Sequence, residues 1–327
     1  MAESYKRPPL EKTPDGKIRR VGIEIEFSDV DLEASGKIVQ RLFGGRLTHS
    51  DPHRFKVLDT QFGDFLVELD FTIIHLEDRP EQSELSPLLQ EIEAELAKTA
   101  GDIAALWLPR EIACPPIPFD KLDRLETLVT ELRKAGATGT TGRWFAAYGM
   151  QINAELARHD VAYLLQHLRA YLLLSAWLRQ KIDVNLKRRL TPFIDPFSNA
   201  YISKVIDPDY APDLGGLMDD YMEANPTRSR ELDLLPIFGH FDPERVKRRL
   251  PNVKVRSRPA FHYRLPDSKV DNPEWNLARE WNFWLEVERL AMDSDRLAKL
   301  QTAYIDHHDQ ILSFGWAEKV DEILSGL

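Results

Sequence analysis

Residues 20–28, which read RVGIEIEFS, constrain the fold most, because apolar and polar side chains alternate along them. A repeat of two residues is typical of a β-strand, in which successive side chains point to opposite faces of a sheet. The apolar residues from Val21 to Phe27 are expected to face a core. Glu24 and Glu26 are then expected to share the other face, so that one strand presents two carboxylates to one surface.

A second acidic surface is expected on a neighbouring hairpin, formed by residues 55–61 and 65–74. If residues 63–64 form a two-residue turn, Asp59 lies directly opposite Glu68. Like charges that face each other destabilise a sheet, and a bound cation would remove that penalty. Carboxylate oxygens favour Mg²⁺, Mn²⁺ or Ca²⁺ over zinc, so the facing acids predict a site for a hard divalent metal.

Acids also alternate on ordinary solvent-exposed strands, so one acidic pair is weak evidence for a metal site. Here the pattern recurs, because Asp70 is expected on the same face as Asp59 and Glu68, with no basic residue among them. We therefore prefer the metal interpretation, with Glu24 and Glu26 of the first strand and Asp59 and Glu68 of the hairpin as ligands.

Later segments carry side chains that complement these acids. Residues 145–156 predict a strand, and residues 253–265 predict two extended stretches, each with polar side chains at alternate positions. Acids at one end of a sheet and arginines at the other suit a metal-bound polyphosphate, although surface ion pairing is the simpler alternative for each arginine. Arg143 is expected either to line a nucleotide pocket or to form a structural turn. The other candidate binding or catalytic residues in these segments are Gln151, Asn153, Glu155, Arg256, Arg258, His262 and Arg264.

The remaining pattern predicts a sheet covered by helices on one face. Residues 106–114 are expected to be extended, and helices are expected at 86–97, 119–134 and 161–182 and from 276 to the end of the chain. Gly136 suits the left-handed conformation that stops the second of these helices. We expect one α+β domain over residues 19–327 with a mainly antiparallel sheet, preceded by a flexible arm at 1–18. The proline-rich segment 192–251 is expected to form either an irregular lid or a few short helices.

Composition narrows the classes of partner. The net charge is −10, opposite to that of most proteins that grip a phosphate backbone, so nucleic acid is not expected as a partner. Cys114 is the only cysteine, and residues 1–12 do not read as a secretory signal, so we expect a cytoplasmic protein without disulfides. The most apolar stretch, residues 161–178, is too short and too polar for a membrane span. Oligomeric state cannot be read from these features.

Four segments resemble an amidoligase family within the superfamily of glutamine synthetase and glutamate–cysteine ligase. The string GIEIEF at 22–27 is similar to the family's opening strand, and REIACPPIPF at 110–119 to its segment with an acid before two prolines. YGMQINAEL at 148–156 and RPAFHYRLP at 258–266 are similar to its later strands. The matches occur in the family's order and span most of the chain.

The resemblance implies a curved antiparallel sheet whose concave face binds metal and ATP. It implies an ATP- and Mg²⁺- or Mn²⁺-dependent ligase that joins a small-molecule or peptide carboxylate to an amine through an acyl-phosphate. Glu24 and Glu26 would bind metal, and either Glu68 or Glu111 would be the ligand from the second strand. Asp59 is similar to an acid of the family's hairpin.

The same resemblance implies roles for the later polar residues. Arg258 and Arg264 would contact phosphate during catalysis. For the reaction itself, we expect Gln151, Asn153 and Glu155 either to position the substrate or to accept the proton of the amine. Gln151 stands where the family usually has histidine, and His262 stands where it often has an acid. These two departures motivate an alternative, in which the chain binds metal and nucleotide without turnover and serves as a partner or regulatory subunit.

Overall fold

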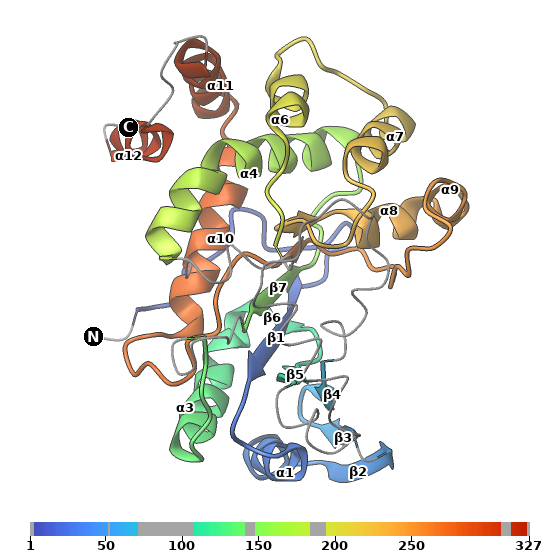
Figure 1. Cartoon of the computed structure of the whole chain (residues 1–327), viewed down its shortest axis with the longest axis vertical. Coiled ribbons are helices and arrows are strands. Elements are labelled where there is room, and N and C mark those ends of the chain that lie inside the picture. The colour runs from blue at the N-terminus through green and yellow to red at the C-terminus, as the bar shows by residue number, and fades with distance from the viewer. Residues whose placement is uncertain are drawn as a thin grey trace, which may run out of the picture.

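The computed structural model describes residues 3–51, 53–70, 108–140, 148–183, 194–308 and 315–325. These residues form an open nine-stranded sheet in the order β2-β3-β4-β5-β1-β7-β9-β8, with β6 paired to β1 beside that row. The ladders between the strands are antiparallel. Figure 1 shows β1 and β7 near the middle of the molecule, with helices around them. The expected α+β class with a mainly antiparallel sheet is therefore confirmed.

The strand that carries the first acids lies inside the sheet. β1 (Arg20–Phe27) pairs with β5 (Arg110–Ala113) along one edge and with β7 (Met150–Ala154) along the other. Because both edges are hydrogen bonded, the backbone holds the β1 side chains in a defined register with two neighbours. The other strands are β2 (Arg46–Asp51), β3 (Arg54–Thr60), β4 (Gly63–Leu69), β6 (Ile117–Pro118), β8 (Leu232–Asp233) and β9 (His262–Tyr263).

The two faces of β1 differ as the sequence predicts. The alternate apolar residues from Val21 to Phe27 are at most 1% exposed, whereas Glu24 and Glu26 are half-buried. β7 continues the buried face with Met150 and Ile152, which are fully buried. One face of the sheet is therefore core, and the acids lie on the other.

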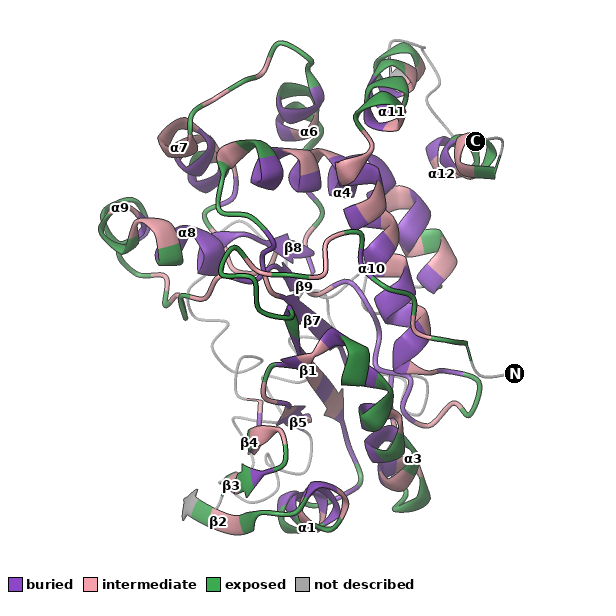
Figure 2. Ribbon diagram, turned by 180° about the vertical axis from the view of Figure 1, so that it is seen from behind, coloured by how far each residue is buried: buried purple, intermediate pink, exposed green. Residues whose placement is uncertain are grey.

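Helices pack on the apolar face. Tyr171 of α4 (Val161–Ile182) and Trp284 of α10 (Leu277–Met292) lie with their ring centroids 5.9 and 5.2 Å from that of Tyr263 in β9. Phe43, the last residue of α1 (Leu32–Phe43), stacks on Phe65 of β4 with ring centroids 5.2 Å apart. Figure 2 shows the buried residues concentrated on α4, α10 and the central strands. The long helix α4 has the predicted bounds.

Helix boundaries follow local signals. The segment predicted as one helix at 119–134 begins with a 3-10 helix, Phe119–Leu125, and continues as α3 (Glu126–Lys134). Gly136 has a φ of 92°, the left-handed conformation expected after this helix. α1 and β2 were not predicted, although Asp31 accepts a hydrogen bond from the Ala34 N–H and so caps α1. The helix predicted at 86–97 lies outside the described residues.

The predicted register of the β3–β4 hairpin is wrong. Arg54, not Asp59, pairs with Glu68, and the strands turn at residues 61–62, because Thr60 pairs with Gly63. The register shifts between Val57 and Thr60, where Asp59 adopts a left-handed φ of 59°. This extra residue moves every earlier residue of β3 relative to β4, as a β-bulge does.

The segment from 194 to 251 contains regular structure, as in the second of the two alternatives. It forms α6 (Asn199–Ile206), α7 (Leu214–Ala224), β8, α8 (Leu235–Phe241) and α9 (Pro243–Arg249). Residues 253–258, predicted as a strand, are not one, and β9 is limited to two residues. After α10 the described chain forms α11 (Ser294–His308) and α12 (Trp316–Ser325), in agreement with the predicted helical end.

Residues 3–6, which belong to the segment expected to form a flexible arm, pack against helices. The Tyr5 hydroxyl donates to Glu126 Oε1 at 2.7 Å, and Trp281 Nε1 donates to the Lys6 carbonyl at 3.0 Å. The Lys6 N–H also donates to Asn282 of α10 at 2.9 Å. Among the described helices, none has both the length and the apolar character needed to cross a bilayer.

Candidate active site

A row of acids crosses three adjacent strands on the polar face. Glu26 of β1 is in register with Glu111 of β5, and Glu111 is in register with Glu68 of β4. Directly opposed residues of an antiparallel pair project to the same face, so the three carboxylates lie side by side. The alternation of β1 and β4 predicted this face for Glu26 and Glu68, and pairing to both strands adds Glu111.

Two acids of this row, Glu26 and Glu111, converge with a third acid, Asp70. One carboxylate oxygen from each of Glu26, Asp70 and Glu111 lies within 4.8 Å of the other two. Asp70 follows β4, and its N–H donates to the Pro109 carbonyl at 2.9 Å, which ties it to the start of β5. We call Glu26, Asp70 and Glu111 the acid cluster.

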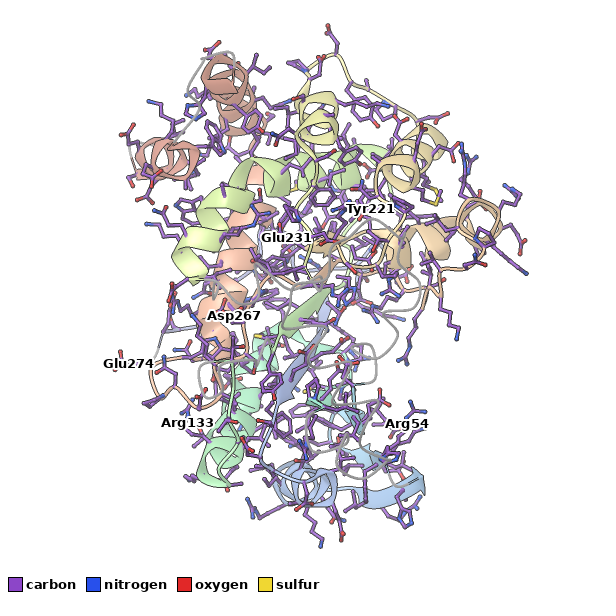
Figure 3. All side chains as sticks on the ribbon, viewed as in Figure 1. Arg54, Arg133, Tyr221, Glu231, Asp267 and Glu274 are labelled. Carbon is purple, nitrogen blue, oxygen red and sulfur yellow. The ribbon has the colours of Figure 1, made fainter. Side chains whose placement is uncertain are left out.

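Glu68 does not belong to the acid cluster. Its Oε2 accepts from Arg54 Nε at 2.5 Å, and Arg54 lies towards the outside of the molecule, on the side of β2 to β4 (Figure 3). Of the two alternatives for the second-strand acid, the structure therefore brings Glu111, and not Glu68, together with Glu26. Asp59 is exposed at the turn end of the hairpin, away from both, because of the changed register.

The electrostatics of the cluster favour a cation. Burial raises the pKa of Glu111 well above its usual range, and the charges of Glu24, Asp70, Glu26 and Glu68 raise it further. Like charges that crowd a half-buried carboxyl disfavour its ionised form, and a divalent cation would reverse that effect. Three carboxylates that converge in this way supply the hard oxygen ligands that Mg²⁺ and Mn²⁺ prefer, so the residues present fit such a metal.

Glu24 lies beside the acid cluster and contacts Asn153 and Arg258, two of the predicted site residues. Its Oε1 accepts from Asn153 Nδ2 at 2.9 Å and lies 3.8 Å from Arg258 Nη2. Arg258 Nη2 in turn donates to Asn153 Oδ1 at 2.6 Å. Arg258 Nε is buried without a hydrogen-bond partner among the described residues. A buried donor of this kind, on a cation next to an acidic site, is available to an oxygen of a bound anion.

The two residues that depart from the family pattern contact each other. Gln151 Nε2 lies 3.5 Å from Glu26 Oε1, and Gln151 Oε1 is hydrogen bonded to His262 Nε2. His262 Nδ1 lies 3.2 Å from Asp233 Oδ2, and Asp233 accepts from Arg228 Nε at 2.5 Å. The two predicted residues therefore form one polar chain with Asp233 and Arg228.

The remaining predicted residues lie further from the acid cluster. Glu155 Oε2 accepts from the backbone N–H of Arg20 at 2.9 Å, at the opposite end of β1 from Glu26. Arg256 is exposed, and Arg264 Nη1 donates to the Arg228 carbonyl. Arg143 lies outside the described residues.

Sequence reasoning did not select three residues that the structure places in or next to the site. Asp70 had been placed on the polar face by alternation, two residues after Glu68, and could have been chosen as a ligand on that ground. Asp233 and Arg228 lie in the segment whose short elements were not predicted, and no repeating pattern in the sequence marks them.

Comparison with known proteins supports the resemblance. The family model described as "Putative amidoligase enzyme" matches residues 17–286, which include all of β1, β5, β7, β8 and β9. No curated protein and no solved structure gives a significant match to the chain. The matched region covers most of the chain and contains the acid cluster, and on this evidence the chain belongs to the amidoligase family.

Proposed function

We propose that this protein is an ATP-dependent carboxylate–amine ligase that forms an amide through an acyl-phosphate, on a sheet of the glutamine synthetase type. Membership of the amidoligase family supports the ligase class. The observation that carries the metal and nucleotide part is the acid cluster, in which oxygens of Glu26, Asp70 and Glu111 lie within 4.8 Å of one another.

The acid cluster would hold Mg²⁺ or Mn²⁺, which would neutralise phosphate oxygens of ATP and orient the γ-phosphate. Arg258 is placed to bind an oxygen of the transferred phosphoryl group, because its Nη2 is held by Asn153 and its buried Nε has no hydrogen-bond partner in the described part of the chain. Such fixed donors stabilise charge that develops in the transition state.

The chemistry has two steps. An oxygen of the substrate carboxylate attacks the γ-phosphorus of ATP and forms an acyl-phosphate. The bond between the γ-phosphorus and the β-phosphate oxygen breaks, and ADP departs. The amine nitrogen then attacks the acyl carbon, phosphate leaves, and the nitrogen loses a proton to a base. Glu24 is better placed than Glu155 to accept that proton, because it lies two residues before Glu26 on the same face of β1, whereas Glu155 lies at the other end of the strand.

Metal binding tests the proposal without knowledge of the substrate. In titrations followed by electron paramagnetic resonance, we expect Glu26→Gln and Glu111→Gln each to weaken Mn²⁺ binding by about tenfold or more. Glu68→Gln is expected to have a smaller effect, because Glu68 is engaged by Arg54. Glu244→Gln, at an exposed site on α9, is the control for loss of a surface charge.

Turnover is tested with ATP, Mg²⁺ and a panel of amino acids and peptides, with hydroxylamine as a general amine. We expect phosphate release that depends on the carboxylate, yields a hydroxamate and is lost in Glu26→Gln. Wild-type affinity for Mn²⁺ in both Glu26→Gln and Glu111→Gln would contradict the metal assignment. Binding of ATP and Mg²⁺ without phosphate release on any pair would favour a partner or regulatory subunit that lacks turnover.

A further inference from the structure

A continuous polar chain runs across the sheet from the acid cluster to β8. It links Glu26 of β1, Gln151 of β7, His262 of β9 and Asp233 of β8 through successive side-chain contacts, and it ends on Arg228. Each strand-borne member comes from the next strand in the sheet order. A chain of this kind transmits the orientation of one polar group to the next, because each hydrogen bond restricts both of its partners.

The donors and acceptors along the chain determine how the Gln151 amide points. Its nitrogen faces Glu26 Oε1 at 3.5 Å, which is sensible because a carboxylate only accepts hydrogen bonds. Its oxygen therefore faces His262 Nε2, and an amide oxygen can only accept. His262 must then carry a hydrogen on Nε2. Burial lowers the pKa of His262, and a neutral ring with that hydrogen leaves Nδ1 to accept from Arg228 Nη2 at 3.4 Å, while Asp233 holds Arg228 in place. If Nε2 were unprotonated, the amide would turn over and direct its oxygen at Glu26.

Burial makes this arrangement rigid. Gln151 is 7%, His262 4% and Asp233 0% exposed, so water is poorly placed to substitute for a lost partner. Asp233 Oδ1 also accepts from the Leu235 N–H at 3.0 Å, which fixes its carboxylate to the start of α8. Burial alone would raise the pKa of Asp233, but the charge of Arg228, whose Nε donates to Oδ2 at 2.5 Å, lowers it to about 2. Asp233 is therefore a fixed anion at the end of the chain.

We propose that Asp233 and His262 are positioning residues that hold Gln151 with its NH₂ group, and not its oxygen, directed into the site beside Glu26. Gln151 then acts as a hydrogen-bond donor to an oxygen of the ATP phosphate chain and is not a metal ligand. This assignment rests on the proposed function for the identity of the bound anion, whereas the orientation of Gln151 follows from the contacts alone.

Gln151 and His262 complement each other beside the acid cluster. An amide in this position adds no negative charge to the acid cluster, where the carboxylates already raise the pKa of Glu111. Its nitrogen supplies a neutral donor at the edge of the cluster, suited to a phosphate oxygen held near the metal ligands. His262 occupies the other end of the amide and so prevents rotation to the acceptor orientation.

The first test is the protonation of His262, which needs no ligand. In nitrogen-15 spectra of histidine side chains, the His262 signals are identified by their absence in His262→Asn. We expect a protonated Nε2 in the wild type and an altered His262 signal in Asp233→Asn. An unprotonated Nε2 in the wild-type protein would overturn the proposed orientation of Gln151.

Glu231→Gln is the matched control. Glu231 precedes β8 by one residue, is 1% exposed, and pairs with Arg179 at 2.5 Å, as Asp233 pairs with Arg228. It lies in the interior beside α4 (Figure 3), where the Tyr171 hydroxyl donates to it, and it has no part in the chain to Gln151. We expect Glu231→Gln to leave the His262 signals in place. The same change in both variants would assign the effect to general disturbance of β8.

The second test compares metal alone with metal and nucleotide. We expect Asp233→Asn, His262→Asn and Gln151→Leu to weaken ATP binding in the presence of Mg²⁺ about tenfold by calorimetry. Mn²⁺ alone should bind within about twofold of the wild type. Equal loss for Mn²⁺ alone would make Gln151 a metal ligand and overturn the inference, as would unchanged ATP binding in all three variants.

The two proposals fail in different ways. A wild-type protein that binds Mn²⁺ but no ATP would contradict the proposed function and with it the phosphate partner of Gln151. The His262 spectra would still decide whether Asp233 and His262 hold the amide. Conversely, normal phosphate release in Asp233→Asn and His262→Asn would reject the positioning pair and leave the ligase proposal intact.

Discussion

Acidic side chains occur in two different surroundings in this molecule. In the acid cluster, Glu111 lies among carboxylates, and burial together with those charges raises its pKa well above the usual range. Asp233 and Glu288 are buried more deeply, yet the pKa of each is lowered, because Arg228 and Arg19 respectively offset the effect of burial.

The contrast separates structural acids from candidate functional ones. Glu288 receives two hydrogen bonds from Arg19, at 2.7 and 2.8 Å, and a third from Trp284 Nε1 at 2.8 Å. A buried acid supported in this way is a stable part of the native core. Carboxylates that crowd one another instead cost stability in the folded chain, and such a cost is typical of a site that receives a cation.

The largest expected effect comes from removal of an arginine partner. Arg19→Met keeps much of the side-chain volume but leaves Glu288 buried without its cation, and we expect a loss of about 3–5 kcal/mol of unfolding free energy. Urea denaturation measures it. The double variant Arg19→Met/Glu288→Met should recover most of the loss, because it removes both charges. A loss below about 1 kcal/mol would show that this pair is not what supports Glu288.

The second expected effect is the loss, at low pH, of the stability that Asp233 contributes. Its folded pKa, about 2, lies below the ordinary value, so its contribution to stability is present above the unfolded pKa and is lost as the pH falls through the folded pKa. We expect Asp233→Asn to be less stable than the wild type by about 2 kcal/mol at neutral pH. The difference should shrink between about pH 4 and pH 2. A difference that does not depend on pH would contradict the charge-based explanation.

The smallest expected effect is a gain in stability, opposite in sign to the two losses above. The folded pKa of Glu111 is raised, so its ionisation costs stability as the pH rises through the unfolded value and towards the folded one. In the presence of a chelator, Glu111→Gln should therefore be more stable than the wild type at neutral pH, and no more stable near pH 4.

Thermal unfolding with Mg²⁺ and with EDTA completes that comparison. We expect Mg²⁺ to stabilise the wild type and to have little effect on Glu111→Gln. If Glu111→Gln were less stable than the wild type in EDTA, Glu111 would belong with the structural acids, and the distinction between the two surroundings would fail.

Much of the sheet was predictable because its side chains alternate. The burial of Val21 to Phe27, the shared face of Glu24 and Glu26, and the bounds of α4 follow from local periodicity, which depends only on neighbouring residues. The hairpin register was not predictable in the same way. Gly63 suggested a turn two residues too late, and the left-handed Asp59 inserts a bulge that no local pattern marks.

The candidate site shows the same division. Sequence alone identified a strand with two acids on its polar face, a core on the other face and an amidoligase resemblance. Each of these features depends only on short contiguous segments of the chain. Only the tertiary structure decided that Glu26 meets Asp70 and Glu111 and that Glu68 turns to Arg54. It alone joined Gln151 to His262 and Asp233. Those choices depend on which strands become neighbours and in what register, and residues far apart in the chain make them together.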